Sequence, residues 1–451
     1  MTRKGLRACG REKYPFQRET QLHRSEKAWQ GALAASRGLA RLTLPLLLIL
    51  TTSGVHAQTL QVLHWWKSTS ENKAINLLSD RLGDENLELK NVLIPGGSGV
   101  GAGIVLKSRV LAGDAPQVAQ LNGTVTLGEW ADLGLLHEFD AVAESGKWER
   151  LLHPSLMALV QPRGHVIAAP LGIHRINTLF YNRKLLARFD IAPPQTWTEF
   201  DRAAARLQQA GVVVLAQSSE PWQVATLFET LVLAEGGAKF YRDLFVRKDA
   251  RAFADLRLAH ALTRFRGLKK YMASPVQERP WTDIARQLAE GSAAMMVMGD
   301  FVKGELNAWG YPTDGVFGCT PVPETGELFL YDVDTLVMLA GDGSDRLAQE
   351  KLALVVTSAA TQADYNQIKG SIPALRNPDL SKMDSWSRAS YKLYARSSAV
   401  QVPSLTHRMA TDEMTREAMV AAVHRFFVND TISVAEIQRR LALIAAATSR
   451  K

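Results

Sequence analysis

Strand-like and helix-like segments alternate along this chain from residue 60 onward, and this alternation limits the possible folds more than any other feature. Short apolar runs at residues 60–66, 89–95 and 117–122 are typical of strands. Helices are expected between and after them, at residues 71–82, 103–113 and 126–136. Because strands that alternate with helices form βαβ units, the pattern predicts an α/β fold with a largely parallel sheet.

A second block of the same character begins near Ala168. It opens with a strand-rich stretch and continues into an amphipathic helix capped by Thr196 or Thr198. Later apolar runs at residues 291–300 and 334–341 are typical of buried strands. Two α/β lobes with several chain crossings account for this order, and a ligand cleft is expected between the lobes.

The first 57 residues are interpreted as an export signal. Arg37 and Arg41 precede a short apolar core at residues 42–50, and a small-x-small pattern follows at residues 55–57. These are the three parts of a signal peptide, here with an extended basic n-region, and cleavage is expected after Ala57. The core is too short to span a bilayer well, so we expect the mature chain in the periplasm.

Charge and cysteine content bear on the possible partners. The chain carries +8, and residues 1–57 contribute +7 of this through ten Lys and Arg against three Glu. The mature chain is therefore almost neutral, and its charge gives no argument for nucleic-acid binding. Cys9 lies in the leader and Cys319 is the other cysteine of the sequence, so no internal disulfide is expected.

The sequence lacks the motifs of nucleotide, metal and hydrolytic sites. The glycine loop at residues 95–103 does not end in the Gly-Lys-Ser/Thr of a P-loop, and neither HExxH nor G-x-S-x-G occurs. Asp332 and Asp334 lie on one side of a strand, but two solvated aspartates are a commoner explanation of this spacing than a glycosidase pair. We expect no enzymatic activity, no cofactor and no metal.

Several tryptophans stand beside turn-like or polar residues: Trp65 and Trp66 in HWWKST, Trp222 in SEPWQV and Trp281 in ERPWTD. Some of them are expected in the core, because tryptophan is highly buried on average. Neighbours on a regular strand point to opposite faces, so Trp65 and Trp66 cannot both fill one core face. An indole near polar groups suits a sugar, which has an apolar C–H face and a rim of hydroxyls.

Segments spread over residues 60–430 together resemble the sugar-binding proteins of bacterial ABC importers, and within that family the glucose/mannose-binding branch. They are VLHWWKSTSE, LKSRVLAGDAPQVAQLNGTVTLGEWADLGLL, APLGIHRINTLFYN, PPQTWTEF, MVMGDFVKGE, DVDTLVML and KGSIPA. No single segment is decisive, but the ordered set is specific.

The resemblance implies a two-lobed periplasmic-binding-protein fold of the class II type, with the ligand cleft between lobes joined by a hinge. After the signal peptide at residues 1–57, we expect the first lobe to begin at residues 58–168 and the second at residues 169–332. We expect a return to the first lobe at residues 333–380. A C-terminal helical part, mostly in the second lobe, is expected at residues 381–451.

The resemblance also implies the residues that contact the sugar. One of the paired aromatics should stack on the ring, and a histidine, His407, is matched less securely than the other positions. The matched positions are Trp65, Trp66, Glu71, Gln120, Asn122, Trp281, Phe301, Asp334, Lys369 and His407. His174 also matches a family histidine, and we interpret it as structural or as a support for the site because it lies at the expected lobe crossing.

Two positions depart from the family pattern. Asn122 stands where relatives often carry Lys or His, and Phe301 stands where they often carry Trp. Asn122 can hydrogen-bond a hydroxyl without charge, and Phe301 keeps a stacking face without the indole N–H. Both changes bear on which sugar is bound more than on whether a sugar is bound.

The resemblance implies a periplasmic solute-binding protein that captures a monosaccharide, glucose or a close epimer, and passes it to an ABC permease in the inner membrane. A monomer is expected. An oligosaccharide-binding protein of the same fold is the first alternative, and a periplasmic carbohydrate-active enzyme is the second. A sensor that presents the same closed form to a receptor is a third.

Overall fold

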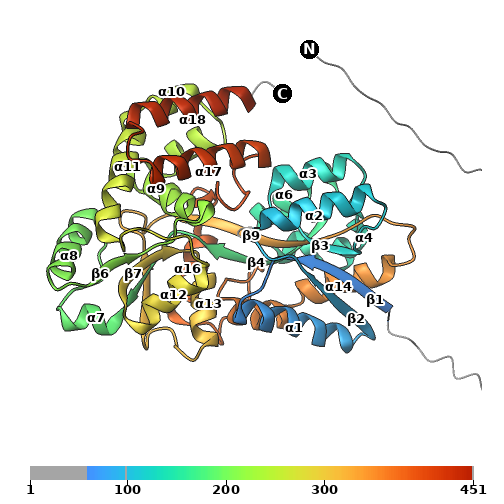
Figure 1. Ribbon diagram of the computed structural model, residues 1–451. Coiled ribbons are helices and arrows are strands. Elements are labelled where there is room, and N and C mark those ends of the chain that lie inside the picture. The colour runs from blue at the N-terminus through green and yellow to red at the C-terminus, as the bar shows by residue number, and fades with distance from the viewer. Residues whose placement is uncertain (1–57, 97–98, 449–451) are drawn as a thin grey trace, which may run out of the picture. The chain divides into compact units, whose positions relative to one another are not determined.

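The structure is a computed structural model, and it describes residues 58–96 and 99–448 (Figure 1). These residues form two lobes, each with a sheet and a hydrophobic core of its own. The export signal predicted at residues 1–57 lies outside the described residues. Within the described ranges, no helix combines the length and the apolar character that crossing a bilayer requires.

The first lobe is built on a six-stranded sheet in the order β10-β9-β3-β1-β2, with β4 paired to β9. Its strands are β1 (Gln58–His64), β2 (Leu87–Leu93), β3 (Val118–Gln120), β4 (Ala168–Arg175), β9 (Phe329–Met338) and β10 (Gln401–Pro403). Its helices are α1 (Thr69–Gly83), α2 (Val100–Leu111), α3 (Thr124–Asp132), α4 (Asp140–Ser145), α5 (Trp148–Leu151), α6 (Pro154–Val160), η2 (Pro162–Gly164), α14 (Arg346–Thr357), α15 (Ala359–Lys369) and α16 (Ser385–Arg396).

The second lobe is built on a four-stranded sheet in the order β6-β7-β5-β8. Its strands are β5 (Thr178–Asn182), β6 (Val213–Ala216), β7 (Ala293–Met298) and β8 (Phe317–Pro321). Its helices are α7 (Arg183–Arg188), α8 (Trp197–Gln209), α9 (Pro221–Phe245), α10 (Ala250–Phe253), α11 (Leu256–Gly267), η3 (Leu268–Tyr271), α12 (Trp281–Glu290), α13 (Phe301–Ala308), α17 (Glu413–Val428) and α18 (Val434–Thr448).

The α/β class is confirmed, but the prediction of a largely parallel sheet is only half right. β1 pairs in parallel with β2 and β3, and β6 pairs in parallel with β7. β9 instead runs antiparallel to β3 and β4, and β5 runs antiparallel to β7 and β8. The reason is that β4 and β9 connect the lobes, so they enter their sheet without the crossover helix that a parallel pair needs.

Local sequence explains why α1 starts where it does. The Ser68 side chain accepts a hydrogen bond from the backbone N–H of Glu71, and the Glu71 carboxylate accepts one from the backbone N–H of Ser68. This reciprocal capping box satisfies donors that a helix start leaves unpaired. The same arrangement begins α8, where Thr196 caps Glu199. Of the two caps expected for the later helix, Thr196 or Thr198, Thr196 is therefore the one used, and Ser68 caps α1.

The chain passes between the two lobes at three short segments. The first falls between Ile173, in the core of the first lobe, and Ile176, in the core of the second. The return falls between Val322 and Phe329. Figure 1 shows β4 and β9 side by side between the remaining strands of the two lobes, and their pairing spans residues 168–175 and 331–337. These paired strands form the hinge of the molecule.

The third passage lies later in the chain than the boundary expected at residue 381. Tyr391 and Tyr394 of α16 pack in the core of the first lobe, so α16 stays with that lobe. Val402 belongs to the core of the second lobe, as do α17 and α18. Similarly, all of β4 pairs with β9, so the change of lobe near residue 169 falls after Ile173.

Candidate functional site

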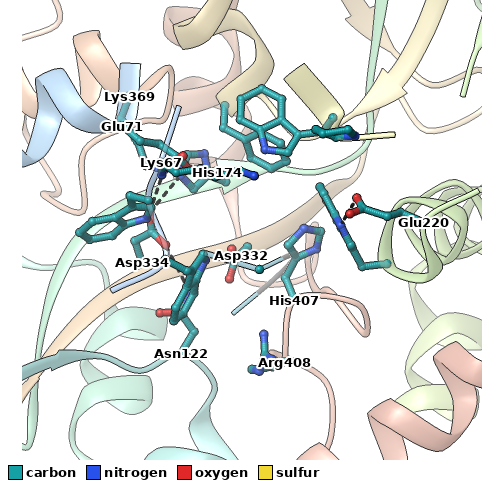
Figure 2. Close-up of a pocket in the computed structure, with 17 residues that line it drawn as sticks. Lys67, Glu71, Asn122, His174, Glu220, Asp332, Asp334, Lys369, His407 and Arg408 are labelled. Carbon is teal, nitrogen blue, oxygen red and sulfur yellow. Dashed lines mark hydrogen bonds and ion pairs between the residues drawn. The ribbon is translucent and has the colours of Figure 1, made fainter. Parts of the chain in front are cut away.

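A pocket lies between the two lobes, beside the hinge strands β4 and β9 (Figure 2). Nine of the ten predicted site residues line it, and Gln120 does not. The residues that line it are Trp65, Trp66, Lys67, Glu71, Gly96, Asn122, His174, Glu220, Trp222, Pro280, Trp281, Phe301, Asp332, Asp334, Lys369, His407 and Arg408.

The two neighbouring indoles have different environments. Trp66 is 1% exposed and packs in the core of the first lobe, with its ring centroid 6.5 Å from that of Tyr365. Trp65 is half-buried and lines the pocket with more of its surface open. Gly99 allows this position, because a Cβ there would come 2.7 Å from the Trp65 ring. The pair thus divides into an anchor, Trp66, and a wall of the pocket, Trp65.

Glu71 and Lys369 form a buried ion pair on the first lobe. The Lys369 Nζ lies 3.1 Å from Glu71 Oε1 and 3.6 Å from Asp334 Oδ2. Burial alone would lower the pKa of Lys369, but the two carboxylates outweigh it and raise that pKa above its ordinary value. The ammonium group also lies 5.3 Å from the centre of the Trp66 ring. Lys369 is therefore a fixed positive charge at the base of the pocket.

Asp334 is surrounded by hydrogen-bond donors. Its Oδ1 accepts from Gln120 Nε2 at 3.0 Å and from Asn122 Nδ2 at 3.3 Å, and its Oδ2 lies 3.3 Å from His174 Nε2. Burial alone would raise the pKa of Asp334, but Lys369 and His174 outweigh it and hold that pKa well below its ordinary value. Asp334 is thus an ionised acceptor whose position is set from several sides.

Gln120 and Asn122 act on the pocket mainly through their neighbours. The Gln120 side chain donates to Asp334 and accepts weakly from the backbone N–H of Trp65, at 3.4 Å. Asn122 lines the pocket, yet its Oδ1 accepts from the backbone N–H of Thr335 at 3.2 Å. Their amide groups hold Asp334 in place.

His174 connects the hinge to the second lobe. Its Nδ1 lies 2.6 Å from Asp300 Oδ1, and its Nε2 faces Asp334. Burial would lower the pKa of His174, but the carboxylates of Asp300 and Asp334 raise it to about 9. His174 is 2% exposed and lines the pocket, so this imidazolium between two carboxylates both supports the hinge and borders the site.

The second lobe contributes an aromatic cluster centred on Phe301. Its ring lies edge-on to Trp281, with centroids 5.2 Å apart, and 6.4 Å from Trp222. It also packs against the rings of His174 and His407, at 5.7 and 6.3 Å. Phe301 is 9% exposed, so it supports the half-buried Trp281 more than it offers a face of its own.

Asp332 and His407 bring unpaired polar atoms to the pocket. Among the described residues, Asp332 Oδ1 and His407 Nε2 are buried and have no hydrogen-bond partner. Burial, with a smaller contribution from Asp334, raises the pKa of Asp332 to about 6, and His407 opposes this shift. Figure 2 shows Asp332 between Asp334 and His407. A ligand would have to satisfy these atoms.

Reasoning from sequence missed part of the lining. Trp222 was noted as an indole suited to a sugar but was not among the matched positions, and Asp332 was weighed only as part of a carboxylate pair. Lys67, Glu220 and Arg408 were not singled out. Each of these three stands within two residues of a recognised position, namely Trp66, Trp222 and His407, and this adjacency was the available signal. Gly96 and Pro280 complete the lining.

The arrangement suits a neutral, polyhydroxylated ligand. The described lining holds four tryptophans and a phenylalanine, and around them stand carboxylates, two ammonium groups, a guanidinium and two histidine rings. Aromatic faces cover apolar C–H surfaces, and charged groups bind hydroxyls through strong hydrogen bonds.

Comparison with families of known proteins gives a match over residues 105–390 to the family described as bacterial extracellular solute-binding protein. A protein of Rhizobium meliloti named probable sugar-binding periplasmic protein is 29% identical over 405 residues, which cover 89% of this chain and 97% of the relative. A protein of the same name from Mesorhizobium japonicum is 30% identical over 314 residues, covering 70% of this chain and 75% of the relative.

Solved structures share the fold. A bacterial solute receptor described as having an exclusive preference for β-D-galactopyranose superposes with a TM-score of 0.76 at 17% identity, covering 87% of this chain and 100% of that one. A maltose-bound protein of T. maritima superposes with a TM-score of 0.70 at 18% identity, again over 87% of this chain and 100% of that one. The predicted two-lobed binding-protein fold is confirmed.

Proposed function

Since this chain belongs to the bacterial extracellular solute-binding proteins, we propose that it is the periplasmic sugar-binding component of an ABC importer. Relatives at 29–30% identity bear the name of probable sugar-binding periplasmic proteins. In this role the protein makes and breaks no bond. It captures its ligand as a monomer and presents the closed form to a permease in the inner membrane.

The observation that carries the proposal is the pairing of aromatic faces with unpaired buried acceptors in one pocket. Trp65 and Trp281 keep part of their surface open, one from each lobe. Asp332 and His407 offer buried atoms that lack partners within the described part of the chain. A sugar meets both demands, because it has C–H faces for the indoles and hydroxyls for the polar atoms.

The size of the pocket favours a monosaccharide, with glucose or a close epimer as the proposed ligand. The space open to the centre of a water molecule is about 90 Å³. One water needs roughly 10–15 Å³ on this measure, so the space is that of roughly six to nine waters. This suits a single sugar ring better than a chain of rings.

Binding is proposed to close the lobes. A ligand that touches Trp65 and Asp334 on the first lobe and Trp281 on the second makes its full set of contacts only when the lobes are together. It therefore favours the closed state by the difference in its affinity for the two states. Periplasmic binding proteins as a class close about a hinge around their ligands, and the same energetic reasoning applies to them.

The test is a thermal-shift screen of residues 58–451 against glucose, mannose, galactose, xylose, maltose and raffinose. A ligand that binds only the folded state stabilises it by about 2.7 kcal/mol at a hundredfold excess over Kd. We expect a clear rise in Tm with one or more hexoses and none with maltose or raffinose. A rise with the longer sugars alone would move the proposal to an oligosaccharide receptor, and no rise with any sugar would contradict it.

Calorimetric titration with the best hexose then tests the site. Trp65→Ala is expected to weaken binding at least tenfold, about 1.4 kcal/mol, because the stacking face is lost. Trp65→Phe is the matched control and should keep most of the affinity, since it retains an aromatic face. Equal affinities for all three proteins would contradict the assignment of Trp65 to the sugar.

A further inference from the structure

The two ring nitrogens of His407 have opposite environments. His407 lies in the loop between β10 and α17 and lines the pocket. Its Nδ1 lies 2.9 Å from the Ser404 hydroxyl. Its Nε2 is buried, with no hydrogen-bond partner among the described residues, and Figure 2 shows the ring directed at the pocket. The protein therefore holds one nitrogen and leaves the other for a ligand.

The hydrogen-bond inventory of Ser404 decides which nitrogen carries the proton. A serine hydroxyl has one donor and two acceptor sites. The Ser404 hydroxyl donates to Glu229 Oε1 at 2.8 Å and accepts from the backbone N–H of His407 at 3.1 Å. Its single proton is used on Glu229, so the remaining site can only accept. The Nδ1 of His407 must therefore be the donor.

Glu229 is fixed as an acceptor by the same reasoning. It is 0% exposed, on α9 in the second lobe. Its Oε2 accepts from the Tyr241 hydroxyl at 2.6 Å and from the backbone N–H of Leu405 at 2.7 Å. The Tyr241 hydroxyl is itself held as a donor toward Glu229, because it accepts from the N–H of Leu405 at 2.9 Å. Every group around the Glu229 carboxyl is a donor, which is what a carboxylate requires.

We propose that the Glu229–Ser404 pair holds His407 as the neutral tautomer protonated on Nδ1, so that Nε2 is a hydrogen-bond acceptor selecting a donor hydroxyl of the ligand. Glu229 and Ser404 are positioning residues, since they act on the ligand only through His407. The proton on Nδ1 follows from the contacts of the protein alone, and the absence of a second proton is inferred from the buried Nε2, which has no partner among the described residues. The use of Nε2 on a hydroxyl rests on the proposed sugar-binding function.

Asp332 makes the same end of the pocket rich in acceptors. Its Oδ1 is a second buried oxygen that has no partner within the described ranges, and it stands beside His407 in Figure 2. Two acceptors that the described residues leave unpaired at one end of the pocket favour a ligand that presents its own hydrogens there. A ligand with fluorine, hydrogen or an ether in place of that hydroxyl leaves the acceptors unpaired, which is costly in a buried site.

The first test reads the tautomer directly, without ligand. Long-range ¹H–¹⁵N spectra of protein labelled on histidine nitrogen distinguish the Nδ1–H form, the Nε2–H form and the imidazolium. His407 is assigned by the signal lost in His407→Gln. We expect the Nδ1–H form at pH 7.5. A signal from the Nε2–H form or from the imidazolium would overturn the proposal.

Glu229→Gln tests the positioning role. The two donors at Oε2 orient the new amide so that its oxygen faces them and its NH₂ faces Ser404. The serine proton is then free to point at Nδ1, and we expect His407 to change to the Nε2–H form. Tyr241→Phe is the matched control, since it removes a donor to Glu229 but leaves the Ser404–His407 contact, and it should keep the Nδ1–H form.

If Glu229→Gln does not fold, Ser404→Ala provides the same test. Ser404→Ala removes the acceptor at Nδ1, so we expect the Nε2–H form of His407 to appear beside the Nδ1–H form in the spectrum. An unchanged Nδ1–H signal in a folded Glu229→Gln or Ser404→Ala protein would show that the pair does not set the tautomer, and would overturn the proposal.

The second test uses deoxy and deoxyfluoro analogues of the hexose that gives the largest thermal shift. At one ring position we expect both analogues to bind wild type about tenfold more weakly than the parent hexose, since neither fluorine nor hydrogen can replace the donor hydroxyl. In His407→Ala we expect the analogues and the parent hexose to differ in affinity by less than twofold. A loss that persists in His407→Ala, or no such position, would overturn the role on the ligand. If no sugar binds but the Nδ1–H form is seen, the sugar-binding proposal fails while the tautomer stands.

Discussion

At the scale of single residues, Asp332 is a buried carboxyl group with a raised pKa and, within the described part of the chain, an unpaired oxygen. It is 6% exposed, its Oδ1 has no partner among the described residues, and its pKa is raised to about 6 by burial first and by Asp334 second. A raised carboxyl pKa means that the folded state holds the proton more tightly than the unfolded state does. Ionisation of Asp332 therefore lowers stability, and this cost grows as pH rises through about 6.

Asp332→Asn should remove this cost. With each pKa unit worth about 1.4 kcal/mol, the variant is expected to unfold with a free energy roughly 2–3 kcal/mol higher than wild type at pH 8. The gain in unfolding free energy should shrink to less than about 1 kcal/mol near pH 4, because Asp332 is protonated in the folded wild type at that pH. Urea unfolding of both proteins without ligand, at pH 8 and pH 4, measures this difference in unfolding free energy.

Asp84→Asn is the control for Asp332→Asn, because Asp84 is exposed. Its effect should be small and the same at both pH values. A gain for Asp332→Asn that does not depend on pH, or a loss at pH 8, would mean that Asp332 is not strained in its ionised form.

Individual site residues were predictable from sequence only where a family pattern marked them. Trp65 and Asp334 stand in recognisable segments, and both line the pocket. Gln120 was matched in the same way but does not line the pocket: it pairs with Leu336 of β9, two residues from Asp334, so its side chain shares a face with that carboxylate and is used on it. Glu229 could not be found, since it stands in an apolar helix and acquires its role from the loop around Ser404, 175 residues later.

At the scale of elements, the start of α1 is held from both lobes. Glu305 of α13 accepts from the backbone N–H groups of Thr69 and Ser70, at 2.9 and 2.7 Å. Trp309 adds a hydrogen bond from its indole to the Thr69 hydroxyl at 3.1 Å. The helix dipole favours a negative charge at this end, and Glu305 is 1% exposed. This contact connects the first lobe to the second at a distance from the hinge strands.

Glu305→Ala is expected to lower the free energy of unfolding by roughly 2 kcal/mol, since it leaves one buried and one part-buried N–H donor without their charged partner. Lys73→Ala is the control at the same interface. Lys73 is exposed and its Nζ donates to the carbonyl of Ala308 at 3.3 Å, so the loss should stay within about 0.5 kcal/mol. Equal losses from both variants in urea unfolding would contradict the special role of Glu305.

The sequence was more informative about elements than about their directions. The helices that begin at Thr69 and Trp197 were both predicted, and for the second the cap was narrowed to Thr196 or Thr198, because capping is a local pattern. The antiparallel course of β9 was not, because a strand pattern contains no direction. Direction is set by where the chain comes from, and β9 comes back from the other lobe.

At the scale of the whole molecule, the paired strands β4 and β9 connect the two lobes. His174 of β4 lies between Asp300, which belongs to the second lobe, and Asp334 of the hinge. His174 therefore joins the two lobes through an ion pair at the strands that connect them, beside the pocket. The predicted family and fold are confirmed at this scale, and the choice of sugar stays a prediction.

Closure should be visible in solution. On addition of saturating hexose, X-ray scattering of residues 58–451 is expected to show a fall in the radius of gyration toward about 21 Å, the value of a compact chain of this length. A sugar that gives no thermal shift is the control and should leave the radius unchanged. A radius that does not respond to a sugar proven to bind would mean that the lobes do not close around it.

The different exposures of Trp65 and Trp66 also determine which tryptophans can report ligand entry by fluorescence. Indole emission shifts to shorter wavelength when water leaves the ring, and Trp66 and Trp148 are already sealed at 1% and 0% exposure. Trp65 and Trp281 are half-buried at the pocket, so they carry most of the signal that ligand entry can change. Ligand entry is therefore expected to shift the intrinsic tryptophan emission, through Trp65 on the first lobe and Trp281 on the second.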